Sequence, residues 1–244
     1  MAKMTLEALT SQLRDAWGET LHAVVLYGSA AAADASTPPA GYDVLVIVDA
    51  LDVAHLQAAS AVVRAWTDAG NPPPMTMTIE EWRTSADIFP MEYADILARH
   101  RTLHGELPTD GVQITTVDLR WQLENQAMGK LLHLRRGVLA SGGDVRRQRE
   151  LLEVSKSAVL VLFRATLQLH GMSPSSDSAE VVRQTARVAG FDAEPFLRVL
   201  RHVRKEAALE SAAVPATLAG YVAGVEQLKR HLDQYSPDQS SLTT

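Results

Sequence analysis

A Gly-Ser pair follows the first short apolar run of the sequence and has residue types suited to holding phosphate. The run, residues 22–27 (HAVVLY), has the length and β-branched content of a strand, and Gly28-Ser29 ends it. Glycine permits close approach of the backbone to a phosphate, and a serine hydroxyl together with the amides of a helix N-terminus holds anionic oxygens. Gly28 and Ser29 are therefore candidate nucleotide-binding residues, although Gly-Ser also follows many strands that have no such role.

An aspartate enters a second strand-like run after a loop. Residues 42–48 (YDVLVIV) are nearly continuous apolar sequence, which favours a strand covered on both faces, and residues 36–41 before them read as a loop. The order of strand, Gly-Ser, short helix, loop and Asp43 on a second strand resembles the nucleotidyltransferase superfamily, which includes the aminoglycoside nucleotidyltransferases. The resemblance implies that Gly28 and Ser29 bind nucleotide and that Asp43 is a catalytic metal ligand. Alternatively, Asp43 is only a polar residue where a loop meets a strand.

The metal site implied by this resemblance lacks ligands in the present sequence. The superfamily pattern has two aspartates at positions i and i+2 of a strand, which point to one face and together bind divalent metal. Leu45 stands at the second position, and leucine cannot bind Mg²⁺. The next strand-like run, residues 75–79 (MTMTI), contains no acid that would supply a third ligand. We therefore expect a depleted metal site at Asp43, with Mg²⁺ and a nucleotide as the candidate cofactors.

Two further carboxylates, Glu92 and Asp95, are candidate catalytic residues because they would replace the missing ligands. They lie three residues apart, and either one would complete a metal site if it reached Asp43. The alternative is that these carboxylates bind local backbone or pair with Arg99 or Arg101.

The resemblance extends beyond the strands and into the C-terminal half. The segments similar to uncharacterised bacterial nucleotidyltransferase-like proteins are residues 87–95, 99–106 and 119–124. Streptomycin-type nucleotidyltransferases also append a helical domain that helps to form the substrate cleft, and residues 118–235 would be its counterpart. The Ala-rich, lysine-poor composition favours a bacterial origin.

Three other groups of residues have a chemical interpretation and a simpler one. His100 and His104 would bind metal on one face of a helix, but no third ligand is apparent, so histidines at the surface or core edge are favoured. Arg164 and His170 have the R-x5-H spacing of some helical ribonucleases, a spacing that arises easily by chance in helices. Arginines around residues 142–143 would attract phosphate or an acidic partner, or would be solvated helix ends. These arginines are Arg135, Arg136, Arg146, Arg147 and Arg149.

The elements that position these residues follow two patterns along the chain. Strand-like runs alternate with helical periodicity in residues 1–112, which predicts an α/β domain with a small mixed sheet and flanking helices. Residues 89–96 are interpreted as holding a further short strand. Residues 113–236 have helical periodicity throughout and predict an all-α bundle, in which Asp144 caps one helix. The polar residues 237–244 are expected to form a flexible tail.

Composition narrows the class of protein. With 46% hydrophobic and 21% charged residues, the 244-residue chain is an ordinary globular protein rather than a disordered one. The absence of cysteine excludes disulfides, thiolate metal sites and a cysteine nucleophile. There is no bilayer-length apolar run and no signal-peptide pattern, so a cytoplasmic protein without membrane contact is expected. The net charge of −6 argues against a broad nucleic-acid surface, leaving a small molecule or nucleotide, and a second copy in a homodimer, as expected partners.

Two hypotheses of function follow from these observations. The favoured one is a degenerate nucleotidyltransferase-like protein that keeps a nucleotide- or phosphate-binding cleft and has a regulatory or binding role. The alternative is an active nucleotidyltransferase that moves a nucleoside monophosphate from a nucleoside triphosphate to a hydroxyl of a small molecule or protein. Leu45 and the acid-free run 75–79 favour the first, and the order of Gly28, Ser29 and Asp43 motivates the second.

Overall fold

The chain folds into two compact units, each described by itself. The computed structural model describes residues 4–31 and 41–236, without the side chain of Ser29. One unit spans Met1–Ile114 and the other Thr115–Thr244. The expected tail, 237–244, and most of the expected loop at 36–41 lie outside the described residues.

The first unit is built around a mixed sheet. In chain order its elements are α1 (Leu6–Trp17), η1 (Gly18–Thr20), β1 (Leu21–Tyr27), η2 (Gly28–Ala31), β2 (Asp43–Val48), α2 (Val53–Asp68), β3 (Met75–Thr78), α3 (Ile79–Thr84), α4 (Pro90–Ala98) and β4 (His100–Gly105). Within the described residues four strands pair in the order β3-β2-β1-β4. β1 is antiparallel to β2 and β4, whereas β2 and β3 are parallel. The expected small mixed sheet with flanking helices is confirmed.

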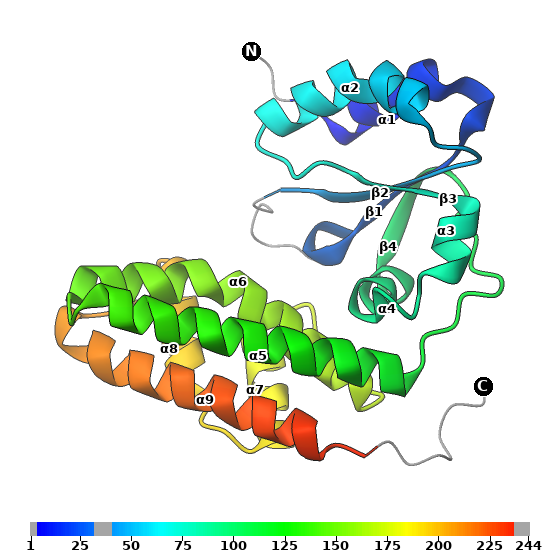
Figure 1. The fold of residues 1–244 in the computed structure, drawn as a ribbon. Coiled ribbons are helices and arrows are strands. Elements are labelled where there is room, and N and C mark those ends of the chain that lie inside the picture. Colours follow the sequence, from blue (N-terminus) through cyan, green and yellow to red (C-terminus); the bar gives the residue numbers. More distant parts are fainter. Residues whose placement is uncertain (1–3, 32–40, 237–244) are drawn as a thin grey trace. The chain divides into compact units, whose positions relative to one another are not determined.

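Apolar side chains cover the sheet on both faces, as the nearly continuous apolar runs predicted. Val24 and Val46 belong to a buried cluster with α1 and α2. Val25 and Leu45 belong to the opposite cluster, which includes residues of α3 and α4. Figure 1 shows the two pairs of helices on opposite sides of the strands. Since alternate residues of a strand share a face, Asp43 lies on the same face as Leu45, toward α3 and α4.

The segment 89–96, which was expected to hold a strand, forms helix α4 instead. Pro90 occupies the first turn, where its fixed φ suits a helix and its missing N–H is not needed. The helix buries Tyr93, whose ring stacks on Trp82 at a centroid distance of 4.1 Å and whose hydroxyl donates to the Trp82 carbonyl at 2.8 Å. The strand comes later, as β4, which pairs with the outer side of β1.

The second unit is a helical bundle, as expected. Its elements are α5 (Thr116–Ser141), α6 (Val145–Leu169), α7 (Ser178–Ala189), α8 (Glu194–Val203), η3 (Ser211–Ala213) and α9 (Val214–Gln234). α5 ends at Gly142, which has the left-handed conformation, and the Asp144 carboxylate caps α6 by accepting the backbone N–H groups of Arg146 and Arg147. α6 packs against α5, α7, α8 and α9. None of the helices in the described ranges combines the length and the apolar character needed to cross a bilayer.

Candidate functional site

Gly28 and Asp43 lie side by side at one end of the β1–β2 pair. The antiparallel register sets Tyr27 opposite Asp43, so the residue that follows β1 lies beside the first residue of β2. Gly28 has a φ of +71°, and a Cβ added to it would lie 3.0 Å from Oδ2 of Asp43. Only glycine therefore combines this backbone conformation with this contact. The structure brings together two of the predicted site residues, while the side chain of Ser29 lies outside the described atoms.

Asp43 is partly buried and lies within reach of the charge of a second carboxylate, Asp95. Burial, and then the charge of Asp95, raise the pKa of the Asp43 carboxyl above its ordinary value. The neighbouring Tyr27 has its pKa raised to about 12, first by burial and then by the charges of Asp43, Glu92 and Asp95. Because like charges and burial both disfavour a carboxylate, this neighbourhood would gain from a bound cation. All three predicted catalytic carboxylates thus act on one part of the first unit.

Asp95 has a second partner that competes with such a role. It forms an ion pair with Arg99 across one turn of α4, with Nη2 of Arg99 2.9 Å from Oδ1 of Asp95. Both side chains are largely buried, with exposed fractions of 19% for Arg99 and 27% for Asp95. The charge of Asp95 therefore both reaches Asp43 and is partly neutralised by Arg99.

Among the described residues, the side chains that share the sheet face of Asp43 do not offer the paired carboxylates of a two-metal site. Leu45, which shares a sheet face with Asp43, is fully buried in the core cluster with α3 and α4, so its position is a packing position. β3 consists of methionine and threonine and supplies no carboxylate. Within the described part of the chain, no three His, Asp or Glu side chains gather as ligands of one metal ion. Asp43 and Asp95 are hard oxygen donors of the kind that suit Mg²⁺, and two such carboxylates from the described residues are fewer than the clamp of two ions uses.

Comparison with known proteins extends the likeness to the whole architecture. The fold matches that of a spectinomycin adenyltransferase from Enterococcus faecialis, solved with ATP and spectinomycin, with a TM-score of 0.58 over 93% of this chain and 97% of that chain. The chain has a nucleotidyltransferase fold. At 12% identity the fold is what the two proteins share. The sequence matches no protein-family model and no curated protein sequence.

Within this nucleotidyltransferase fold, the two histidines considered as a metal pair do not share a helix. His100 and His104 lie on β4, where a rise of about 3.3 Å per residue separates positions four apart by roughly 13 Å. Nδ1 of His100 donates to the carbonyl of Ile96 at 2.8 Å, so this side chain anchors the turn between α4 and β4.

The arginines around residues 142–143 are partly engaged within the bundle. Arg135 forms an ion pair with Glu226 of α9 at 2.8 Å, and Nη2 of Arg149 donates to the Ser211 hydroxyl at 3.0 Å. These contacts connect the α5–α6 turn to α9 and η3. They support the interpretation of this group as helix-end residues of the bundle.

Arg164 and His170 do not form a paired ribonuclease-like site. Nη1 of Arg164 donates to the carbonyl of Ser175 at 2.6 Å, which ties the segment after α6 back to the helix. His170 instead meets His231 of α9, with 2.9 Å between their Nε2 atoms.

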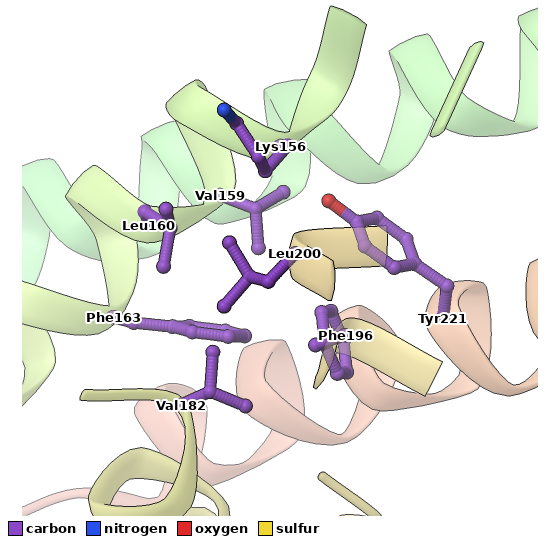
Figure 2. A pocket seen from close by; sticks show the side chains of 8 residues that line it. All are labelled: Lys156, Val159, Leu160, Phe163, Val182, Phe196, Leu200 and Tyr221. Carbon is purple, nitrogen blue, oxygen red and sulfur yellow. The ribbon is translucent and has the colours of Figure 1, made fainter. Parts of the chain in front are cut away.

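The helical unit also contains a small apolar cavity (Figure 2), which is too small to hold a substrate. Its volume is about 10 Å³, close to the lower limit for a single water molecule. Its lining side chains are Lys156, Val159, Leu160, Phe163, Val182, Phe196, Leu200 and Tyr221. This cavity is a packing defect of the bundle core and gives no support to a ligand site there.

Sequence reasoning missed Tyr27 as a neighbour of the carboxylates. Tyr27 is the last residue of β1 and shares a face with Val25, so it projects toward the α4 side of the sheet. The alternation of side chains along β1 already predicts the face on which Tyr27 lies. Its carboxylate neighbours could not be predicted, because they depend on α4, whose Glu92 and Asp95 act on Tyr27.

Proposed function

We propose that the chain is a degenerate nucleotidyltransferase-like protein that binds a nucleotide or another phosphate-bearing small molecule and has a binding or regulatory role. The observation that carries this proposal is the complete burial of Leu45, at the position where the resemblance requires the second metal carboxylate. Without that carboxylate, two metal ions cannot both stabilise the triphosphate and activate an attacking hydroxyl.

The proposed ligand contacts the chain at the turn after β1, where glycine at position 28 permits close approach of the backbone to a phosphate. The adjacent Asp43 carboxylate opposes an anion when it is ionised. Because burial and Asp95 raise the pKa of Asp43, this opposition weakens as the pH falls and Asp43 takes up a proton. Binding without metal is therefore expected to strengthen as the pH falls through the raised pKa of Asp43.

A second candidate, an active nucleotidyltransferase, is favoured by one specific observation. The charges of Asp95 and Glu92, carried on α4, act on Asp43 and Tyr27. In this candidate Asp43 holds Mg²⁺ together with a carboxylate of α4, and a nucleoside monophosphate passes from a triphosphate to a hydroxyl of a small molecule or protein. Its nucleotide binding would require Mg²⁺ and would weaken as the carboxylates are protonated.

Calorimetry on the full chain distinguishes the two candidates. Each nucleoside triphosphate is titrated with Mg²⁺ and with a chelator, and each mixture is assayed for transfer of labelled nucleotide to hydroxyl acceptors, including spectinomycin. Binding that persists in the chelator without transfer supports the degenerate protein. Mg²⁺-dependent binding with transfer overturns it in favour of the enzyme, and absence of binding under both conditions contradicts both candidates.

Asp43→Asn is the matched variant for this experiment. In the degenerate protein, loss of the charge leaves metal-free binding intact or stronger. In the enzyme, the same change removes the metal ligand, so binding and transfer are both lost.

A further inference from the structure

Two histidines from distant parts of the chain meet in the helical unit. His170 follows the last residue of α6, and His231 lies in the last turn of α9. Their Nε2 atoms are 2.9 Å apart, whereas their ring centroids are 5.1 Å apart with an interplanar angle of 28°. The two rings therefore point toward each other through Nε2 and do not overlap face to face.

The distance between the two Nε2 atoms is that of a hydrogen bond in which the two rings share one proton. A neutral imidazole has one N–H donor and one bare nitrogen, so one Nε2–H donates to the other Nε2. Two nitrogens bound to one tetrahedral metal ion, each at about 2.0–2.1 Å, would lie roughly 3.3 Å apart. The observed 2.9 Å is shorter and fits a hydrogen bond better than a metal bridge.

The histidine pair is part of a larger contact between the ends of two helices. The ring of Tyr235, which follows α9, meets the ring of His170 edge-on at a centroid distance of 4.9 Å. The Tyr235 hydroxyl donates to the carbonyl of Leu169, the last residue of α6, at 3.0 Å. The end of α6 is thus held to the end of α9 by two neighbouring hydrogen bonds.

Several charged groups on the surrounding elements are engaged with other partners. Burial, and then the charge of His231, lower the pKa of His170. Burial lowers the pKa of His231. No carboxylate of the described residues contributes to either shift, so none stabilises an imidazolium here. The neighbouring charged groups are the ion pairs Arg120–Glu124 on α5 and Lys229–Asp233 on α9, Arg164 on α6, and Arg230 beside His231.

We propose that His170 and His231 form a proton-operated latch, in which one shared proton holds α6 to α9 and protonation of both rings opens the contact. A first proton from solvent leaves one imidazolium and one neutral imidazole, which still share a proton between their Nε2 atoms. A second proton from solvent makes both rings imidazolium, so both Nε2 atoms carry hydrogen, two positive charges face each other, and the rings must separate. The Tyr235 contact on the same helix ends is weakened with them.

The direction in which folding stability changes with pH follows from the two pKa shifts. Each histidine has a folded-state pKa below its ordinary value of 6.5, so the unfolded chain binds these protons more readily than the folded one. The stability contributed by the neutral pair is present above pH 6.5 and is lost as the pH falls below it. Each histidine that gains a proton on unfolding makes the unfolding equilibrium constant rise by up to tenfold per unit of pH decrease.

The latch is tested by urea unfolding of the full chain at about pH 7.5 and about pH 5.5, which bracket the ordinary histidine value. His231→Gln keeps a side chain that can hydrogen-bond to His170 but does not titrate. His133→Gln, at an exposed position of α5, is the matched control. The unfolding constant of the wild type and of the control is expected to rise by up to about tenfold more between the two pH values than that of His231→Gln, because the variant lacks one titrating histidine. Equal pH dependence in all three proteins overturns the latch.

Ring-nitrogen NMR of the wild-type chain keeps the test decisive if His231→Gln does not fold. The latch predicts one histidine protonated on Nε2 and the other on Nδ1 at neutral pH, with both titrating below 6.5. Two rings of the same tautomer that titrate independently at ordinary values contradict it. Stabilisation of the wild type, but not of His231→Gln, by added Zn²⁺ would identify a metal site and would also overturn it.

Discussion

The carboxylate of Asp43 lies against the backbone of Gly28, with Oδ2 3.0 Å from the position that a Cβ on Gly28 would occupy. The contact joins the turn after β1 to the first residue of β2, and it makes the size of residue 28 as important as its conformation.

Gly28→Ala is therefore expected to destabilise the chain by about 1–3 kcal/mol, because it adds a left-handed alanine and a clash with Asp43. Gly111→Ala is the control, since Gly111 also has a positive φ, +80°, but has nothing within 4 Å of an added Cβ. Urea unfolding measures the loss of unfolding free energy in each of the two variants. Equal losses in the two variants would show that the Asp43 contact is unimportant.

Asp43→Asn should stabilise the chain at neutral pH. The pKa of Asp43 is raised in the folded state, so its favourable contribution is present below the ordinary value of 3.8 and is lost as the pH rises through the folded-state pKa. The asparagine variant lacks this loss. The unfolding free energy is measured for both proteins from acidic to neutral pH. That of the wild type should fall relative to that of Asp43→Asn as the pH rises. The same pH dependence in both proteins would refute the raised pKa of Asp43.

Leu45→Asp restores the carboxylate of the superfamily pattern but is expected to damage the fold rather than rebuild a metal site. Leu45 is fully buried, and an unpaired charge there costs about 3–5 kcal/mol. Leu45→Ala also loses about 2–5 kcal/mol, through a cavity, but its loss does not change with pH. The unfolding free energy of both variants, measured with and without Mg²⁺, shows whether the aspartate binds metal or only damages the fold. Recovery of the aspartate variant in Mg²⁺ would show that position 45 can bind metal.

Arg99→Gln should strengthen the binding of Mg²⁺ to the first unit, because it removes the cation that pairs with Asp95. The expected gain is about fivefold to tenfold, or on the order of 1 kcal/mol. Arg101→Gln, an exposed position on β4, controls for the general loss of positive charge. Titration calorimetry of the metal alone checks this. Identical affinity in both variants would mean that Asp95 does not contribute to cation binding.

The sequence named Gly28 and Asp43 as candidate site residues but did not predict their contact. A strand that ends in glycine and a second strand that begins at an aspartate place these two residues together only when the strands pair antiparallel, and that pairing is not read from local order. The mixed sheet, its two covered faces and the helical second unit were predictable, since the apolar patterns are long and regular.

The α4–β4 region was not predictable in the same way. The apolar residues of 89–96 suit a short strand or a short helix, and only packing of Tyr93 on Trp82 decides between them. β4 pairs with β1 alone and is mostly exposed, so it lacks the apolar signature of the inner strands. The position of Glu92 and Asp95 relative to Asp43 depends on both elements, which is why the sequence left the composition of the site open.

The burial of Leu45 also limits how the protein can change over evolutionary time. Gaining the paired-aspartate pattern would require more than one substitution, because the side chains packed around position 45 from α3 and α4 must first make room for hydrated charge. Each intermediate would carry a weakened core without yet gaining a working metal site. A carboxylate at position 45 is thus hard to acquire, and descendants of this chain are expected to keep the leucine or replace it with another apolar residue.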